Sequence, residues 1–77
     1  MNNIRRKQLK EAIELIEQAR SIVESVQDEE QDAFDNLPEN LQCSERGETM
    51  EENADRLGEI WDSLSDQVDE IDDIIAQ

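Results

Sequence analysis

Apolar residues recur at helical spacing through the second half of the chain. Steps of four and three residues separate them, and no charged residue interrupts the row. The row consists of Met50, Ala54, Leu57, Trp61, Leu64, Val68, Ile71 and Ile75. It predicts a helix over about 44–76 with one buried and one solvated face. Thr49 and Glu52 would form a capping box if the regular helix started beyond Gly47.

A similar row in the first half predicts a second long helix, over about 3–34. Its apolar members are separated by steps of three and four residues. They are Leu9, Ala12, Ile16, Ala19, Val23 and Val26, and we expect them to form the seam that faces the other helix. Asn2 or Asn3 is the expected N-cap. The charge of Glu30 interrupts the row before the chain turns.

The segment 35–43 is the expected connector between the two helices. Pro38 has no backbone N–H to donate and disfavours helical geometry for Leu37. Asn36 could cap a single helical turn that starts near Pro38. Because the two helices are of matched length, the fold class predicted is all-α, with an antiparallel two-helix hairpin forming a single domain over 1–77.

Apolar residues outside the two rows predict a larger assembly. A two-helix contact would not bury them, so we expect a second hairpin to cover them in a homodimeric four-helix bundle. These flanking residues are Ile13, Leu15, Ile22, Ile60 and Ile74. Gly58, beside the second row, would permit a close approach of the helices, or it is an ordinary tolerated helix glycine.

Composition narrows the function to binding. The 77 residues include no His, no Tyr and one Cys, so a His-based catalytic triad, a thiolate/imidazole zinc site and a disulfide framework are excluded. We expect no catalytic residues, no cofactor and no enzymatic activity. Neither a membrane span nor a signal peptide is expected, and the lone Cys43 favours a reducing compartment, so the predicted location is cytosolic.

Charge is the strongest compositional signal. The chain has 22 Asp and Glu against 7 Lys and Arg, a net charge of −15. Residues 1–20 carry five bases and three acids, so residues 21–77 carry −17. Nucleic acid and anionic membranes are therefore poor partners.

The acidic face of the second helix is the candidate partner-binding site. Carboxylates spaced three and four residues apart rise about 4.5–6 Å per step, a distance similar to the spacing of phosphates along a nucleic-acid strand. The candidate residues are Glu51, Glu52, Asp55, Glu59, Asp62, Asp66, Asp69, Glu70 and Asp73. They could mimic phosphates for a protein with a basic surface, or they could form a solvated face that keeps the protein soluble.

Two further charged groups have simpler interpretations. Asp28, Glu30, Asp32, Asn36 and Glu39 match positions of a calcium-binding loop, but Ala33 stands where the turn needs glycine, so we expect no metal site. Arg5, Arg6, Lys7 and Lys10 form a basic tip. In an antiparallel hairpin this tip would pair with Asp69, Glu70, Asp72 and Asp73, within the chain or across a dimer.

One motif resembles a known family. The sequence Asp35-Asn36-Leu37-Pro38-Glu39-Asn40-Leu41-Gln42, followed by Ser44-Glu45-Arg46-Gly47-Glu48, is similar to small acidic proteins of phages and prophages in Gram-positive bacteria. The resemblance covers nearly the whole chain, although Cys43 stands where that family has a small residue. It implies a viral or prophage origin and a location in the bacterial host cytoplasm, and it supplies no activity and no site residues.

Three functions remain open from the sequence. The first is inhibition of a host nucleic-acid-binding or defence protein by the acidic helix. The second is a structural or assembly role, in which the apolar faces self-associate or bind a partner helix. The third, capture of a small ligand at a dimer interface, ranks last because so acidic a chain would repel a nucleotide phosphate.

Overall fold

The first long helix, α1, spans Asn3–Asp35 in the computed structural model, which describes residues 1–77. Its N-cap is Asn2, whose side-chain oxygen accepts a hydrogen bond from the backbone N–H of Arg5 at 2.8 Å. At the other end, the backbone N–H of Asn36 donates to carbonyls of the last turn. The helix therefore begins where the sequence predicts and ends one residue later.

A short helix, α2, spans Glu39–Gln42 within the connector. It begins directly after Pro38, so the single turn expected near that proline is confirmed. Asn36 does not cap it, because Asn36 already closes the end of α1. The amide nitrogen of Gln42 donates to the carbonyl oxygens of Phe34 at 3.4 Å and Leu37 at 3.2 Å. These two hydrogen bonds tie α2 to the end of α1.

The second long helix, α3, spans Glu45–Ile75. Ser44 is its N-cap and accepts a hydrogen bond from the backbone N–H of Gly47 at 3.3 Å, while its hydroxyl donates to the carbonyl of Leu41. The later start at a Thr49 capping box is therefore not used. Glu45 and Glu48 lie in the first turn, where negative charge is favourable to the helix dipole.

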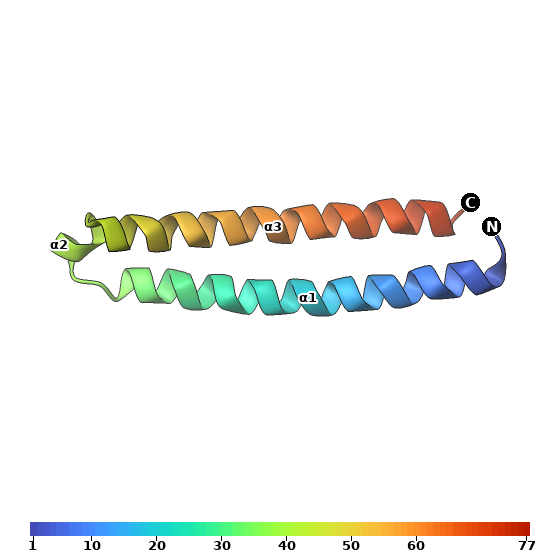
Figure 1. Cartoon of the computed structure of the whole chain (residues 1–77), viewed down its shortest axis with the longest axis horizontal. Coiled ribbons are helices and arrows are strands. Elements are labelled where there is room, and N and C mark those ends of the chain that lie inside the picture. The colour runs from blue at the N-terminus through green and yellow to red at the C-terminus, as the bar shows by residue number, and fades with distance from the viewer.

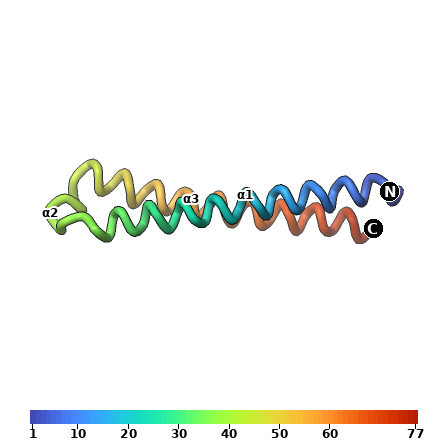
Figure 2. Tube along the Cα trace, turned by 90° about the horizontal axis from the view of Figure 1, so that it is seen from below, coloured from blue at the N-terminus to red at the C-terminus, as the bar shows by residue number.

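The two long helices lie side by side and run in opposite directions, so both chain ends meet at one end of the molecule (Figures 1 and 2). The molecule measures 59 × 15 × 13 Å. No strand is present, which confirms the predicted all-α class. Neither helix contains an apolar stretch long enough to cross a membrane.

The α3 seam matches the sequence prediction. All eight residues of the predicted row are half-buried or buried, from Met50 to Ile75. Ala54 is 2% exposed and Val68 is 7% exposed. These two are the only buried apolar residues of the molecule, because a pair of helices covers only one side of each.

The α1 seam differs from the prediction in its register. Ala19 and Val26 were expected in the seam, and both are exposed. Ile13 was expected on the flank, and it lies in the seam. The observed half-buried row again follows steps of three and four residues. It consists of Arg6, Leu9, Ile13, Ile16, Arg20, Val23, Gln27, Glu30 and Phe34, and the predicted seam residue Ala12 is half-buried beside it.

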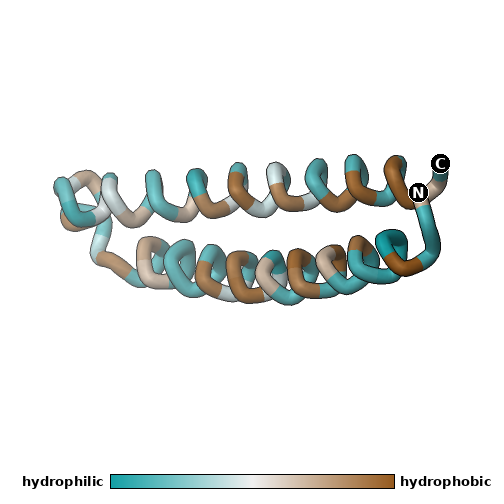
Figure 3. The backbone as a smooth tube through the Cα atoms, turned by 45° about the vertical axis from the view of Figure 1, so that its right-hand side comes forward, coloured by the Kyte–Doolittle hydropathy of each residue, from teal (hydrophilic) through white to brown (hydrophobic).

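Polar side chains therefore occupy four positions of the α1 seam. The Arg20 guanidinium lies 4.2 Å from the centroid of the Trp61 ring. Its Nη1 also forms an ion pair with Glu17 Oε2 at 2.8 Å. Its Nε is buried without a hydrogen-bond partner. Apolar positions nevertheless recur along both helices (Figure 3), so α1 has more apolar surface than this seam uses.

We predict that Arg20→Met increases the free energy of unfolding by about 1 kcal/mol. The change removes a buried donor that has no hydrogen-bond partner, and such a donor destabilises the folded state by about 1–3 kcal/mol. The thioether of the new methionine keeps a favourable contact with Trp61. The lost ion pair with the exposed Glu17 contributes little. Urea unfolding checks this, and a loss of stability would show that the cation–π contact outweighs the unsatisfied nitrogen. Arg20→Ala should destabilise, because it uncovers the ring.

Candidate binding surfaces

Seven carboxylates form a continuous line along α3, which we call the acidic stripe. They are separated by steps of three and four residues and extend about 32 Å along the helix axis. The stripe consists of Glu52, Asp55, Glu59, Asp62, Asp66, Asp69 and Asp73. Asp66 stands two residues before the buried Val68, about 200° around the helix, so the stripe points away from α1.

Every side chain of the predicted partner-binding site is exposed. Glu51 and Glu70, the two members outside the stripe, lie beside it on opposite edges. None of the nine carboxylates forms an ion pair, because the single ion pair of the molecule joins Arg20 to Glu17. The structure thus brings seven of the nine predicted residues into one line and leaves all nine free to contact a partner.

The acidic stripe carries uncompensated repulsion between its own members. Like charges at neighbouring helical positions destabilise a helix by a few tenths of a kcal/mol per pair. No base forms an ion pair with the stripe to offset this repulsion. A basic surface that bound the stripe would relieve the repulsion, and such binding would weaken with salt.

A second surface is apolar, and we call it the apolar face. Large side chains on it remain exposed, including Ile4 at 71%, Leu15 at 62% and Ile22 at 65%. Its six members are Ile4, Leu15, Ile22 and Val26 of α1 with Ile60 and Ile74 of α3. Four of the five flanking residues that the sequence set apart from the seam are therefore exposed, with Ile13 the exception.

The two halves of the apolar face lie on the same side of the helix pair. Ile60 lines a hollow together with Glu30 of α1. Val26 stands one helical turn before Glu30, and Ile22 stands one turn before Val26. Ile74 follows Ile60 by fourteen residues, four turns of the helix. The face therefore runs along both helices, separate from the acidic stripe.

The basic tip does not form the ion pairs expected with the acidic end of α3. None of its four bases has a carboxylate of α3 within ion-pair distance. Arg6 instead donates hydrogen bonds to main-chain carbonyls, from Nε to Ile75 at 3.2 Å and from Nη2 to Gln77 at 2.6 Å. α3 has no base in its own last turn, so Arg6 supplies the positive charge that its C-terminus favours.

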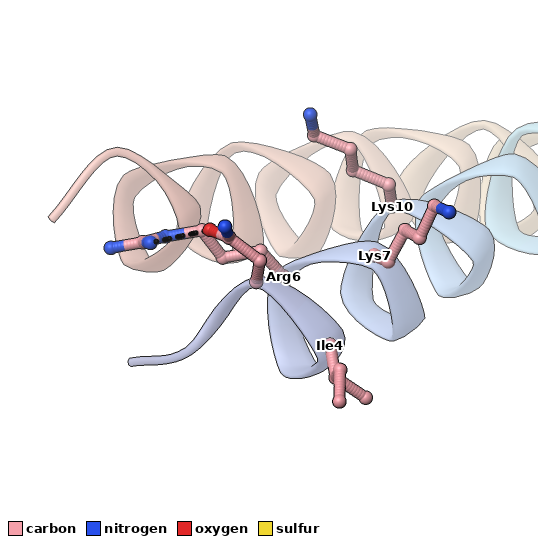
Figure 4. Close-up of a pocket in the computed structure, with 5 residues that line it drawn as sticks. Ile4, Arg6, Lys7 and Lys10 are labelled. Carbon is pink, nitrogen blue, oxygen red and sulfur yellow. Dashed lines mark hydrogen bonds between the residues drawn. The ribbon is translucent and has the colours of Figure 1, made fainter.

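Three of the four bases of the tip border an open hollow. Its lining includes Ile4, Arg6, Lys7 and Lys10, and Ile4 points away from the three bases (Figure 4). Arg6 is held in place by its bonds to α3 and by a bond from Nη1 to the Asn3 side chain at 3.3 Å. Lys7 and Lys10 are exposed and form no ion pair.

Hydrophobicity alone does not identify the polar residues that border the apolar face. Glu30 lines two adjoining hollows, one with Arg46 and one with Arg56. These two are the only bases after Arg20. Spacing was an available signal for Arg46 only, because Arg46, Asn53, Ile60, Gln67 and Ile74 are each seven residues apart and Arg56 lies outside this series.

The residues of the rejected calcium loop lie mostly within regular helix. Asp28, Glu30 and Asp32 belong to α1, so they do not form a loop between two helices.

Comparison with known proteins adds no relative, because no family model, no curated protein and no solved structure matches this sequence. Function must therefore be argued from the two surfaces.

Proposed function

We propose that this protein is a non-enzymatic binding protein of phage type that inhibits a host protein in the bacterial cytoplasm. The acidic stripe would occupy the basic surface with which that host protein binds nucleic acid. Inhibition would then result from direct competition with DNA or RNA. The observation that carries this proposal is a line of seven exposed carboxylates without a single ion pair.

Three features support an electrostatic role. The stripe is straight and about 32 Å long, enough to contact several basic side chains at once. Residues 21–77 hold only two bases, so little positive charge within the chain competes with a partner. The resemblance of the connector motif to small acidic phage proteins agrees with a target in the infected cell.

The test is capture from a bacterial lysate on the immobilised protein at low salt, followed by elution in a salt gradient. Each eluted protein is then bound to labelled DNA or RNA, and the free chain is added as competitor. Elution at moderate salt together with displacement of the nucleic acid would support the proposal. A retained protein that keeps its nucleic acid would contradict it.

We predict that the triple variant Asp62→Lys, Asp66→Lys and Asp69→Lys loses at least about tenfold in affinity for the captured protein. The three changes reverse the centre of the stripe, and each like-charge contact opposes binding. Affinity is measured by titration at fixed salt, and the slope of affinity against salt should also decrease.

A matched control changes the same total charge elsewhere. Glu14, Glu24 and Asp28 are exposed residues of α1, and their replacement by lysine leaves the stripe intact. This control should keep most of the affinity. If both triple variants lost binding equally, net charge rather than the stripe would be responsible.

The apolar face favours a second candidate function, structural assembly. In this alternative the two long helices act as one hairpin and pair with a second hairpin into a four-helix bundle. The exposure of Leu15 and Ile22 is the observation that supports it. Such an assembly would persist at high salt, whereas binding through the acidic stripe would not.

A further inference from the structure

We infer that a second copy of this chain covers the apolar face, and that the two copies lie antiparallel, the connector of each beside the chain ends of the other. This inference rests on the self-association proposed above and names its surface and geometry. It does not depend on the acidic stripe, which stays exposed on the outer side of each copy.

The area of the apolar face matches what a stable pair of proteins needs. One side of a molecule measuring 59 × 15 Å presents about 900 Å², of which an antiparallel pair related by a two-fold axis at Leu15 shares about 650–700 Å². A standard specific interface buries about 800 Å² per partner. The single copy has only Ala54 and Val68 as buried apolar residues, and chains below about 80 residues commonly gain their missing stability by oligomerisation.

The apolar face is also complementary to itself. Ile4 and Val26 stand eleven residues before and eleven residues after Leu15. A two-fold axis through Leu15 would therefore place Ile4 of one copy opposite the partner's Val26, and Leu15 opposite the partner's Leu15. This is the reciprocal contact that an isologous dimer requires.

Charge selects the antiparallel arrangement over the parallel one. The end of the molecule that contains the connector, residues 28–52, carries ten acids and one base, a net charge of −9. The end that contains both termini, residues 1–20 and 62–77, carries nine acids and five bases, a net charge of −4. A parallel pair would bring the two −9 ends together. An antiparallel pair brings each −9 end beside the five bases of the other copy, within the range of unscreened charges.

Cys43 provides the measurement, because it is the only cysteine and is exposed at the connector end. A spin label on Cys43 reports the distance between the two copies by pulsed electron resonance, and sedimentation gives the mass. We expect a dimer of 8.9 kDa chains. Antiparallel copies place the two labels roughly 60–70 Å apart, whereas parallel copies place them within about 30 Å.

The control moves the label to the middle of the molecule. The double variant Cys43→Ser and Ser21→Cys places it at an exposed position near the middle of α1, outside the apolar face. This pair of labels should be roughly 20–35 Å apart in either arrangement. A short Cys43 distance would overturn the antiparallel arrangement, and a monomer without any label distance would overturn self-association. Neither result bears on the acidic stripe, which is tested by capture and nucleic-acid competition.

Discussion

Replacing Gly47 with alanine should disrupt the connector end of the molecule. Gly47 is buried in the first turn of α3, against the chain that leaves α2. An added Cβ would lie 2.6 Å from the carbonyl oxygen of Leu41 and 2.7 Å from the carbonyl carbon of Gln42, and closer still to the Gln42 oxygen. All three are backbone atoms, so a side-chain rotation cannot relieve the overlap. We expect a loss of about 1–3 kcal/mol.

Thermal unfolding followed by circular dichroism measures this loss. A change of 1 kcal/mol shifts the melting temperature of a chain of this size by about 4–8 °C, so the decrease should be at least about 4 °C. In this structure the glycine is required for the close approach of α2 to α3. An unchanged melting temperature would mean that the connector moves aside freely.

Gly58→Ala is the matched control in the same helix. An added Cβ there would meet only the side chain of Gln27, whose amide nitrogen would lie 2.8 Å away and can rotate. Alanine is also the better helix former by about 1 kcal/mol. We therefore expect equal or greater stability from Gly58→Ala. The sequence left two interpretations of Gly58 open, a close approach of the two helices or an ordinary helix glycine. In the structure an added Cβ would meet only the side chain of Gln27 and not the backbone of α1.

Ile22→Glu should convert the expected dimer to a monomer. Ile22 is near the middle of the apolar face, and a second copy would remove its side chain from water. Burying an unpaired carboxylate there would cost several kcal/mol. Sedimentation should show the mass fall from two chains to one. Because an 8.9 kDa helix pair with so small a core is marginal alone, its melting temperature should fall as well.

Ser21→Glu adds the same charge at the neighbouring position. Ser21 is exposed and lies about 100° around α1 from Ile22, away from the apolar face. This variant should keep the mass and melting temperature of the parent. An Ile22→Glu protein that remains a dimer would show that the copies associate through another surface.

The sequence predicts the secondary structure closely because its local signals agree with one another. Asn2 and Ser44 are strong capping residues, and Pro38 stands between two long amphipathic patterns. The α3 row is also predicted correctly, since only one apolar series runs through that helix. Each predicted helix boundary lies within one residue of its observed position.

The α1 seam could not be predicted from hydrophobicity alone because two apolar series overlap in that helix. Leu9, Ile16 and Val23 belong to both candidate rows. Arg20 and Gln27 continue the observed row. A prediction from hydrophobicity instead places Ala19 and Val26 in the seam, because Arg20 and Gln27 end in polar groups. Arg20 is half-buried because its stem packs while its guanidinium covers Trp61.

The acidic residues of the candidate site could be identified from the sequence. The position of the apolar face relative to them could not, because it depends on which residues of α1 form the seam. Exposure of all nine carboxylates follows from their distance around α3 from the seam. The side on which Ile22 and Ile60 come together depends on which α1 residues contact α3. The structure places Ile60 beside Glu30 of α1, and helix geometry places Ile22 two turns before Glu30 on the same side.

The position of both termini at one end gives the molecule a defined mechanical response. A force that pulls the two chain ends apart would first load the hydrogen bonds from Arg6 to Ile75 and Gln77. The helices would then separate one turn at a time toward the connector, a peeling geometry that resists little force. A force applied between Cys43 and either terminus would instead pull along the helix axis.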